Sequence, residues 1–313
     1  MTDVAPEISV VVPTFRSKIA LPELHRRLSE SLDAITTDWE VILVDDASND
    51  GTYEVMESVH LKDQRFKLIR FARNLGQHQA TLCGLQHASG RYVVTLDDDL
   101  QNPPEEIPRF LAKIEEGYDL VIGRIDGEKA HSPGRNLSSW LVQRCVGAIL
   151  GKPKDLQLTA YRAMTQRAAA QIASYTGAHA YLPALMLGSV PLDRITNLTV
   201  EHHERASGAS TYNLRKLVKL FSYLLINHSY VPLRLVTGLG LLLCVLSFGY
   251  GIFVTAVAVF GSSGVPGFPT LAILLSFLSG ATLLGLGIIG EYVGRLVEEN
   301  SRSRQFPIFE ERW

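Results

Sequence analysis

Three consecutive aspartates, Asp97, Asp98 and Asp99, directly follow a mostly apolar run in the chain. Carboxylate oxygens are the hard ligands that Mg²⁺ and Mn²⁺ prefer, and Mg²⁺ sites usually combine one or two carboxylates with substrate phosphates. Adjacent like charges repel, so the cluster needs a counter-cation or wide solvation. We therefore predict that Asp97 and Asp99 bind Mg²⁺ or Mn²⁺. The alternative is a solvated acidic turn that caps the next helix.

Two further polar segments also follow apolar runs. Residues 44–52 read VDDASNDGT, and an acceptor there, on Asp45 or Asp46, can take the N–H of a base such as uracil. The alternative is a turn that only caps the following helix. Residues 73–78 read RNLGQH, in which Arg73 can neutralise a phosphate, orient the aspartates or form a structural ion pair. His78 is interpreted as an ordinary polar position.

A fourth segment, residues 202–212, contains two histidines, an arginine and small hydroxyl residues. This composition suits a phosphate-binding loop, and the alternative is a polar linker. The chain has neither a P-loop nor a G-x-G-x-x-G fingerprint, which argues against NTP hydrolysis and NAD binding.

The elements that must position these residues alternate between strand and helix. Short apolar β-branched runs predict strands, and helical spacing or capping residues separate them. The expected strands are residues 8–12, 41–44, 66–71, 92–96 and 120–122, and the helices are residues 21–35, a segment from Thr52, and residues 76–88. This alternation predicts an α/β fold with a mostly parallel sheet covered by helices on both faces. Ligands bind such sheets at the carboxyl ends of the strands, where the polar segments lie.

Composition excludes several functional classes. The chain has 313 residues, with 30 Lys and Arg against 32 Asp and Glu. The net charge of -2 provides no basic field for nucleic acid. The three cysteines lie far apart, which excludes a disulfide scaffold and a Cys-rich zinc site and suits a reducing compartment.

The apolar residues are concentrated near the C-terminus. No charged residue or histidine lies between Arg234 and Glu291. A spanning helix needs about 20 apolar residues, so we predict two transmembrane helices within residues 233–295, at about 235–260 and 270–290. The alternative is a buried helical hairpin. Residues 213–232 carry an apolar stripe flanked by basic residues and are predicted to form an amphipathic helix at the membrane interface, or alternatively one packed on the soluble domain.

Charge predicts the orientation in the membrane. Arginines and lysines flank both predicted spans, and the loop between the spans carries no charge. Positive residues prefer the cytoplasmic side, and the N-terminus has no signal-peptide pattern. We expect a multi-pass protein of the bacterial inner membrane, with a cytosolic catalytic domain at residues 1–212 and a cytosolic tail at residues 296–313.

With these residues established, the chain resembles inverting family 2 glycosyltransferases of the GT-A fold. Within that family it is similar to membrane-bound polyprenyl-phosphate glycosyltransferases, such as undecaprenyl-phosphate glucosyl and formamidoarabinose transferases and, more distantly, dolichol-phosphate mannose synthases. The shared motifs extend over nearly the whole chain. They are VVPTF at 11–15, VDDASNDGT at 44–52, RNLGQH at 73–78, TLDDDLQNPPEEIP at 95–108, E-x-x-x-G-x-S at 204–210, PLR at 232–234 and GEYVGR at 290–295.

The resemblance implies a metal-dependent transfer of sugar from a nucleotide-diphosphate sugar, expected to be UDP-linked, to a polyprenyl phosphate. Pro13, Phe15 and Asp46 would line the base pocket, and the D-x-D of Asp97 and Asp99 would hold the metal and the donor diphosphate. Arg205 would contact a phosphate and Asp155 would be the catalytic base. The further candidates for the donor site are Asp45, Arg73, Gln77, Asp98 and Ser210. The resemblance also implies a homo-oligomer, a tetramer.

The chain departs from the family pattern at three places. Arg16-Ser17 replaces the usual Asn-Glu, which removes an acid from the base-binding corner. The segment around Asp155 matches the family only loosely, and Thr211 stands where Lys is common. Two other functions stay open at this point: a processive polysaccharide synthase, whose Q-x-x-R-W motif and additional spans are missing from the expected places, and a non-catalytic membrane scaffold, which the intact aspartate pair disfavours.

Overall fold

The structure is a computed structural model that describes residues 5–125, 152–153, 155–177, 180–200, 267–301 and 305–313, with isolated residues between 236 and 260. The chain divides into two compact units, Met1–Thr211 with Ser303–Trp313, and Tyr212–Arg302. The predicted interfacial helix, most of the first predicted span, Arg205 and Ser210 lie outside the described residues.

The first unit is built on one sheet of eight strands, in the order β7-β5-β6-β4-β1-β2-β3-β8. Every strand predicted from the sequence is present. The strands are β1 (Ile8–Thr14), β2 (Trp39–Asp45), β3 (Phe66–Phe71), β4 (Tyr92–Thr95), β5 (Leu120–Ile125), β6 (Arg162–Thr165), β7 (Ile195–Val200) and β8 (Ile308–Arg312).

The sheet is mixed rather than purely parallel. Its centre, β4-β1-β2-β3, is parallel, as is the β5–β7 pair. β6 runs antiparallel to both β4 and β5, and β8 runs antiparallel to β3. The prediction of a mostly parallel sheet is therefore correct for the strands that carry the polar segments, and it did not include β6, β7 or β8.

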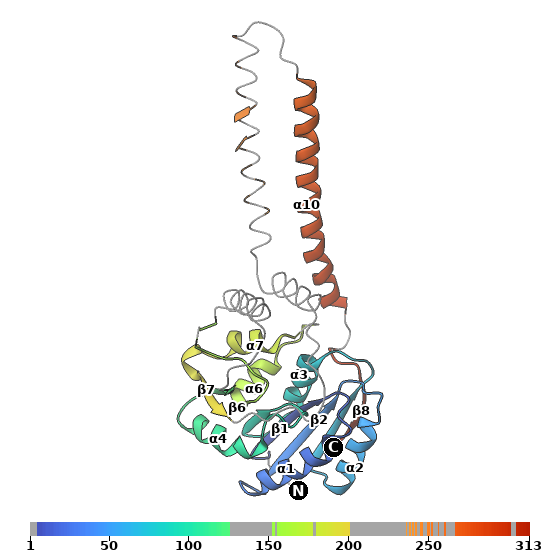
Figure 1. The fold of residues 1–313 in the computed structure, drawn as a ribbon, viewed down its shortest axis with the longest axis vertical. Helices are drawn as coiled ribbons and strands as arrows, with labels where there is room; N and C mark the ends of the chain where they lie inside the picture. Colours follow the sequence, from blue (N-terminus) through green and yellow to red (C-terminus); the bar gives the residue numbers. More distant parts are fainter. Residues whose placement is uncertain are drawn as a thin grey trace, which may run out of the picture. The chain divides into compact units, whose positions relative to one another are not determined.

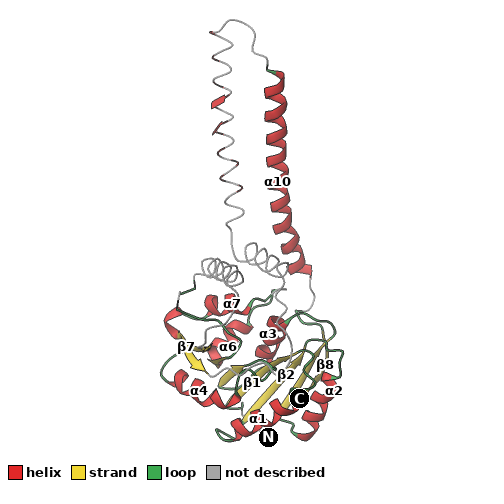
Figure 2. Cartoon of the chain, viewed as in Figure 1, coloured by secondary structure: helices red, strands yellow, loops and turns green. Residues whose placement is uncertain are grey.

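Helices cover both faces of the sheet, as predicted (Figures 1 and 2). One face packs on α1 (Leu21–Asp33), α2 (Thr52–Lys62) and α4 (Ile107–Glu115), the last preceded by the short helix η1 (Pro104–Glu106). The other face packs on α3 (Gln77–His87), α6 (Gln166–Ala173) and α7 (Leu182–Ser189), and η2 (Leu192–Arg194) leads into β7. Strand side chains alternate between these two cores: Val10 and Val12 face the first and Val11 the second.

The C-terminal residues belong to the sheet. Residues 296–313 are predicted above as a cytosolic tail, but residues 308–312 pair with β3 as the edge strand β8. A five-residue strand at a sheet edge gains its stability from pairing, which no local pattern reveals.

In the second unit, α10 (Phe268–Ser301) contains the predicted second span and continues beyond Gly290 to Ser301. Among the described residues it is the one helix that is long and apolar enough to cross a bilayer, over Phe277–Gly294. One such helix is weak support for a membrane span.

Candidate active site

The loops that follow β1, β2, β3 and β4 lie at one edge of the sheet, because these four strands are parallel. We call this edge the rim. Its loops hold the polar segments 44–52, 73–78 and 97–99, and the fourth segment, residues 202–212, lies outside the described residues. Hydrogen bonds described below join these loops to one another, so the rim is a connected unit rather than four separate turns.

Asp98 joins the loop after β4 to the loop after β1. Its Oδ2 accepts a hydrogen bond from the backbone N–H of Phe15 at 3.0 Å and another from the Ser17 hydroxyl. Burial raises the pKa of Asp98 to about 6, although these hydrogen bonds oppose the rise. Ser17 stands where the family has an acid, and the structure shows a carboxylate at this corner after all, contributed by Asp98.

Asp46 joins the loop after β2 to the loop between β3 and α3. Its carboxylate oxygens accept the backbone N–H groups of Leu75 at 2.6 Å and Gly76 at 2.8 Å. The Asn74 amide donates to the Asp46 carbonyl at 3.2 Å. Burial raises the pKa of the Asp46 carboxyl, and these two backbone hydrogen bonds oppose the rise. In this structure Asp46 therefore shapes the rim.

Asp45 is buried at the end of β2 and has a similar structural role. The backbone N–H of Ser48 lies 3.1 Å from its Oδ1, and Arg70 Nε lies 3.6 Å from its Oδ2. Burial raises the pKa of Asp45, opposed by Ser48 and Arg70. Asp45 thus stabilises the turn that follows β2, and Asp46 stabilises the neighbouring loop between β3 and α3.

Asp97 lies between an amide and a buried arginine. The Gln77 amide donates to its Oδ1. Arg162, the first residue of β6, is 5% exposed, and its Nε–H donates to the Thr159 carbonyl. Burial lowers the pKa of Arg162 to about 10, and the nearby Asp97 opposes the decrease. Arg162 is a counter-cation for the aspartates that the sequence analysis did not identify.

His78 lies next to the same arginine. Its ring makes an edge contact with Tyr181, with 5.1 Å between the ring centroids. Burial, with a smaller contribution from Arg162, lowers the pKa of His78 to about 4, so the imidazole is neutral near pH 7. The interpretation of His78 as an ordinary polar position is thus incomplete, because it borders the charged part of the rim.

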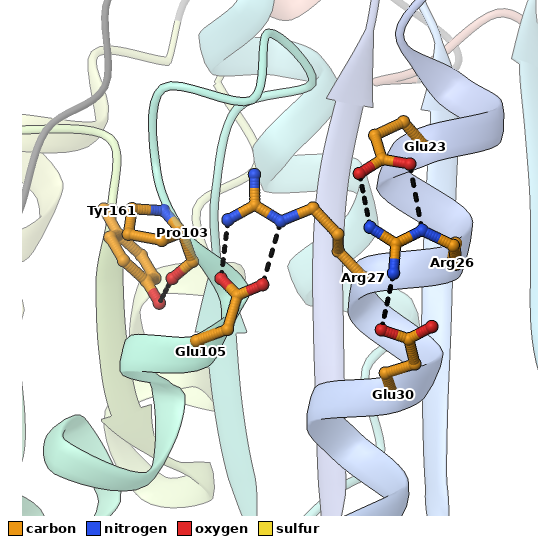
Figure 3. Close-up of polar contacts among 7 residues, drawn as sticks. All are labelled: Glu23, Arg26, Arg27, Glu30, Pro103, Glu105 and Tyr161. Carbon is orange, nitrogen blue, oxygen red and sulfur yellow. Dashed lines mark hydrogen bonds and ion pairs between the residues drawn. The ribbon is translucent and has the colours of Figure 1, made fainter.

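The loop that carries the aspartates is held in place at its far end (Figure 3). The guanidinium of Arg27 in α1 donates two hydrogen bonds to the Glu105 carboxylate, from Nε at 2.8 Å and from Nη2 at 2.6 Å. The Tyr161 hydroxyl donates to the Pro103 carbonyl at 2.8 Å. The loop is therefore fixed from α1 on one side and from the residue before β6 on the other.

Backbone strain is concentrated at the rim. Among the described residues, three non-glycine residues have a positive φ: Arg16 and Ala47 at 58° and Leu100 at 62°. Each lies in a loop that follows β1, β2 or β4. Such conformations cost about 1–2 kcal/mol each, and they persist only where the surrounding contacts fix them. Their position is typical of a functional site.

The remaining predicted residues are distributed around this network. Pro13 is buried within β1, and Phe15 is 44% exposed with the Arg16 guanidinium 5.2 Å from its ring centroid. Arg73 is exposed in the loop after β3, and Asp155 is exposed in a turn. Asp99 is half-buried and accepts the Gln101 backbone N–H at 3.2 Å.

The described part of the chain contains no group of three His, Cys, Asp or Glu side chains arranged to hold a metal ion. Asp97 and Asp99 supply two carboxylates, which suits a cation whose other ligands come from a substrate. A cavity of about 190 Å³ lies near the starts of β5 and β7, lined in part by Asp119, Arg167 and Arg194. It lies away from the rim and is not part of this site.

Comparisons with known proteins agree with this architecture. Residues 9–177 match the family model described as glycosyl transferase family 2. The chain is 34% identical to the undecaprenyl-phosphate 4-deoxy-4-formamido-L-arabinose transferases of Salmonella choleraesuis and Salmonella paratyphi B, over 98% of this chain and 94% of each relative.

Solved structures are similar in fold at lower identity. A glucosyl-3-phosphoglycerate synthase from Mycobacterium tuberculosis, in complex with Mn²⁺, UDP and glucosyl-3-phosphoglycerate, has a TM-score of 0.50 and 20% identity over 71% of this chain and 78% of that one. Its complex with phosphoglyceric acid has a TM-score of 0.52 and 19% identity over 70% and 80%. This likeness confirms the GT-A-like α/β fold.

Proposed function

Because the chain belongs to glycosyl transferase family 2, we propose that it transfers a sugar from a nucleotide-diphosphate donor, with UDP as the nucleotide, to a polyprenyl phosphate at a membrane surface. The observation that carries the proposal is the rim: the loops after four parallel strands are hydrogen-bonded together around Asp46, Asp97 and Asp98. The acceptor class is supported by the full-length similarity to undecaprenyl-phosphate sugar transferases.

The residues at the rim fit a divalent cation. Asp97 and Asp99, which are separated by one residue, offer carboxylate oxygens as ligands. The carboxylate of Asp98, between them, accepts hydrogen bonds from Phe15 and Ser17. We propose that Asp97 and Asp99 hold Mg²⁺ or Mn²⁺ together with the donor diphosphate. When bound, such a cation neutralises the charge that develops on the leaving diphosphate. The solved relative in fold that contains Mn²⁺ and UDP supports this assignment.

The proposed reaction is a single displacement with inversion. An oxygen of the acceptor phosphate attacks the anomeric carbon, the bond from that carbon to the diphosphate oxygen breaks, and the nucleoside diphosphate leaves with the electron pair. A phosphate monoester has a second pKa of about 6 and is mostly ionised near pH 7. The nucleophile therefore needs little deprotonation, and Asp155 would position the acceptor as much as act as a base.

The other donor-site assignments remain proposals that follow from the family. Pro13 and Phe15 would border the base. The Asp46 carboxylate would accept an N–H of the base in addition to the two backbone N–H groups that it already accepts. Arg73 and Arg205 would contact phosphates, and Gln77, Asp45 and Ser210 would support the same site. Arg162 joins this set from the structure, since it contributes positive charge beside Asp97.

We also propose how the enzyme is placed in the cell. Two transmembrane helices, one of them within α10, would anchor a cytoplasmic catalytic domain to the bacterial inner membrane. The positive residues that flank both predicted spans support this orientation. A homo-tetramer is proposed from the resemblance alone, and light scattering of the detergent-solubilised protein tests it.

The experiment that tests the function uses purified full-length protein, a panel of nucleotide sugars and undecaprenyl phosphate, with mass spectrometry of the lipid. We expect one donor to yield a glycosylated lipid phosphate. The matched control is Asp99→Asn with added Mn²⁺, which should lose at least about a hundredfold in turnover. Unchanged turnover in that variant would remove the metal role, and no product from any donor would contradict the proposed function.

A further inference from the structure

The C-terminal tail, residues 305–313, contacts the start of the rim loop between β3 and α3. Its strand β8 pairs with β3, with Ile308 opposite Phe71. Just before that strand, the carbonyl of Pro307 accepts the backbone N–H of Ala72 at 2.8 Å. The tail therefore fixes the first residue of the loop that contains Leu75, Gly76 and Gln77.

Phe306 anchors this contact in the core. It is 7% exposed and stacks on Phe71, with 5.8 Å between the ring centroids and 8° between the ring planes. It belongs to the same buried cluster as Ala80 and Cys83 of α3. Phe306 thus packs on the last residue of β3, within the buried cluster that also contains residues of α3.

Gln305 extends the contact to two helices. Its Oε1 accepts the Gln86 amide of α3 at 2.9 Å, and its Nε2 donates to the Tyr175 carbonyl just beyond α6 at 2.7 Å. Gln305 is therefore fixed by hydrogen bonds to α3 and to the residue beyond α6, and these bonds help to set the position of the tail along β3.

A continuous series of contacts leads from the tail to the aspartates. Pro307 holds Ala72, the loop then offers its Leu75 and Gly76 N–H groups to Asp46, and Gln77 bonds Asp97. Within the loop, the Asn74 amide also donates to the Asp46 carbonyl, and Gly76 has a φ of 92°, which favours glycine. Because both ends of the loop are already fixed, less conformational entropy is lost when a ligand binds to it.

We propose that the C-terminal tail is a positioning element of the donor site: Phe306 and Pro307 hold the β3–α3 loop in the conformation that aligns Asp46 and Gln77 at the rim. This inference rests on the proposed function for its ligand, a nucleoside diphosphate. It gives the tail, which follows α10 in the chain after residues 302–304, a role in donor binding that acts through this loop.

The test compares Phe306→Ala with the matched control Phe309→Ala in full-length protein in detergent. Phe309 lies three residues further along the tail, in β8, and is 71% exposed. Two quantities are measured: hydrogen exchange of the peptide that spans residues 72–77, and the affinity for UDP with Mn²⁺ by calorimetry. We expect Phe306→Ala to exchange faster and to bind UDP about fivefold more weakly, and Phe309→Ala to match the wild type in both.

The conservative variant Phe306→Leu should restore most of the UDP affinity, because it keeps apolar volume on Phe71. If Phe306→Ala does not fold, Gln305→Ala is measured in the same two ways, with faster exchange and about twofold weaker binding expected. Unchanged exchange of residues 72–77 overturns the proposal, and so does faster exchange with unchanged UDP affinity. A wild type that binds no nucleotide contradicts the proposed function instead, and the exchange measurement still decides whether the tail holds the loop.

Discussion

Replacing Arg162 with methionine should stabilise the fold while weakening donor binding. Arg162 is buried beside Asp97, and its Nε–H bonds only the carbonyl of Thr159 among the hydrogen bonds described above. A charge that is taken out of water costs free energy unless its partners compensate for the lost hydration. Methionine retains much of the side-chain volume and removes the charge.

The magnitude follows from the pKa. Burial lowers the pKa of Arg162 from 12.5 to about 10, even though Asp97 raises it. Each pKa unit corresponds to about 1.4 kcal/mol, so the charged form costs the folded state about 3 kcal/mol. Losing the hydrogen bond to Thr159 costs about 1 kcal/mol. The net expectation for Arg162→Met is a gain of about 2 kcal/mol in the free energy of unfolding.

The assay is thermal unfolding of the full-length protein in detergent, together with calorimetric titration of UDP and Mn²⁺. For a domain of about 200 residues, a gain of about 2 kcal/mol raises the midpoint by roughly 4–8 °C. UDP affinity should fall about thirtyfold, because the anionic diphosphate loses the positive charge that Arg162 contributes to the donor site. Arg167→Met, on the exposed side of α6, is the matched control and should change neither quantity. A destabilised Arg162→Met that still binds UDP normally would refute the reasoning.

Three further substitutions test individual groups. Asp46→Asn leaves only one oxygen for the N–H groups of Leu75 and Gly76, so the free energy of unfolding should fall by about 1.5–3 kcal/mol in denaturant titrations; an unchanged midpoint would contradict this. Asp155→Asn should reduce turnover only a few-fold, and a loss of several orders of magnitude would instead indicate proton abstraction. His78 has a pKa of about 4 when folded against 6.5 ordinarily, so the unfolded chain binds the proton first and stability should fall as the pH drops from 6.5 to 4. From pH 7 to pH 5 the free energy of unfolding of the wild type should fall by about 2 kcal/mol relative to that of His78→Gln. The comparison cancels the opposite contribution of Asp98, whose pKa burial raises to about 6.

Much of the fold follows from local sequence pattern. The strand that begins at Ile8 is a mostly apolar, β-branched run, which is how a strand buried on both faces is recognised, and the strand that begins at Phe66 has apolar residues at four of its six positions. The parallel arrangement then places the polar segments at one edge without further information. In contrast, β6 begins at a charged residue, Arg162, and β8 is short and alternates between half-buried and exposed positions. Neither has a pattern of its own, and both depend on the neighbouring strand.

The candidate site shows the same division. Residue type and position after a strand were sufficient to select Asp97 and Asp46, but not to assign their contacts. That Asp98 supplies the carboxylate beside Ser17 depends on two loops 81 residues apart in the chain. The burial of Arg162 is a property of the folded sheet, so a single arginine in an unremarkable segment gave no local signal.

The most direct test of the account is whether the rim binds a nucleoside diphosphate together with a cation through its aspartates. UDP is titrated into full-length wild type and Asp97→Asn, each with Mn²⁺ and with EDTA, and the heat of binding is measured. We expect EDTA to weaken binding to the wild type at least about tenfold, and Asp97→Asn to bind equally weakly in both conditions. Full Mn²⁺-dependent binding by Asp97→Asn would contradict it.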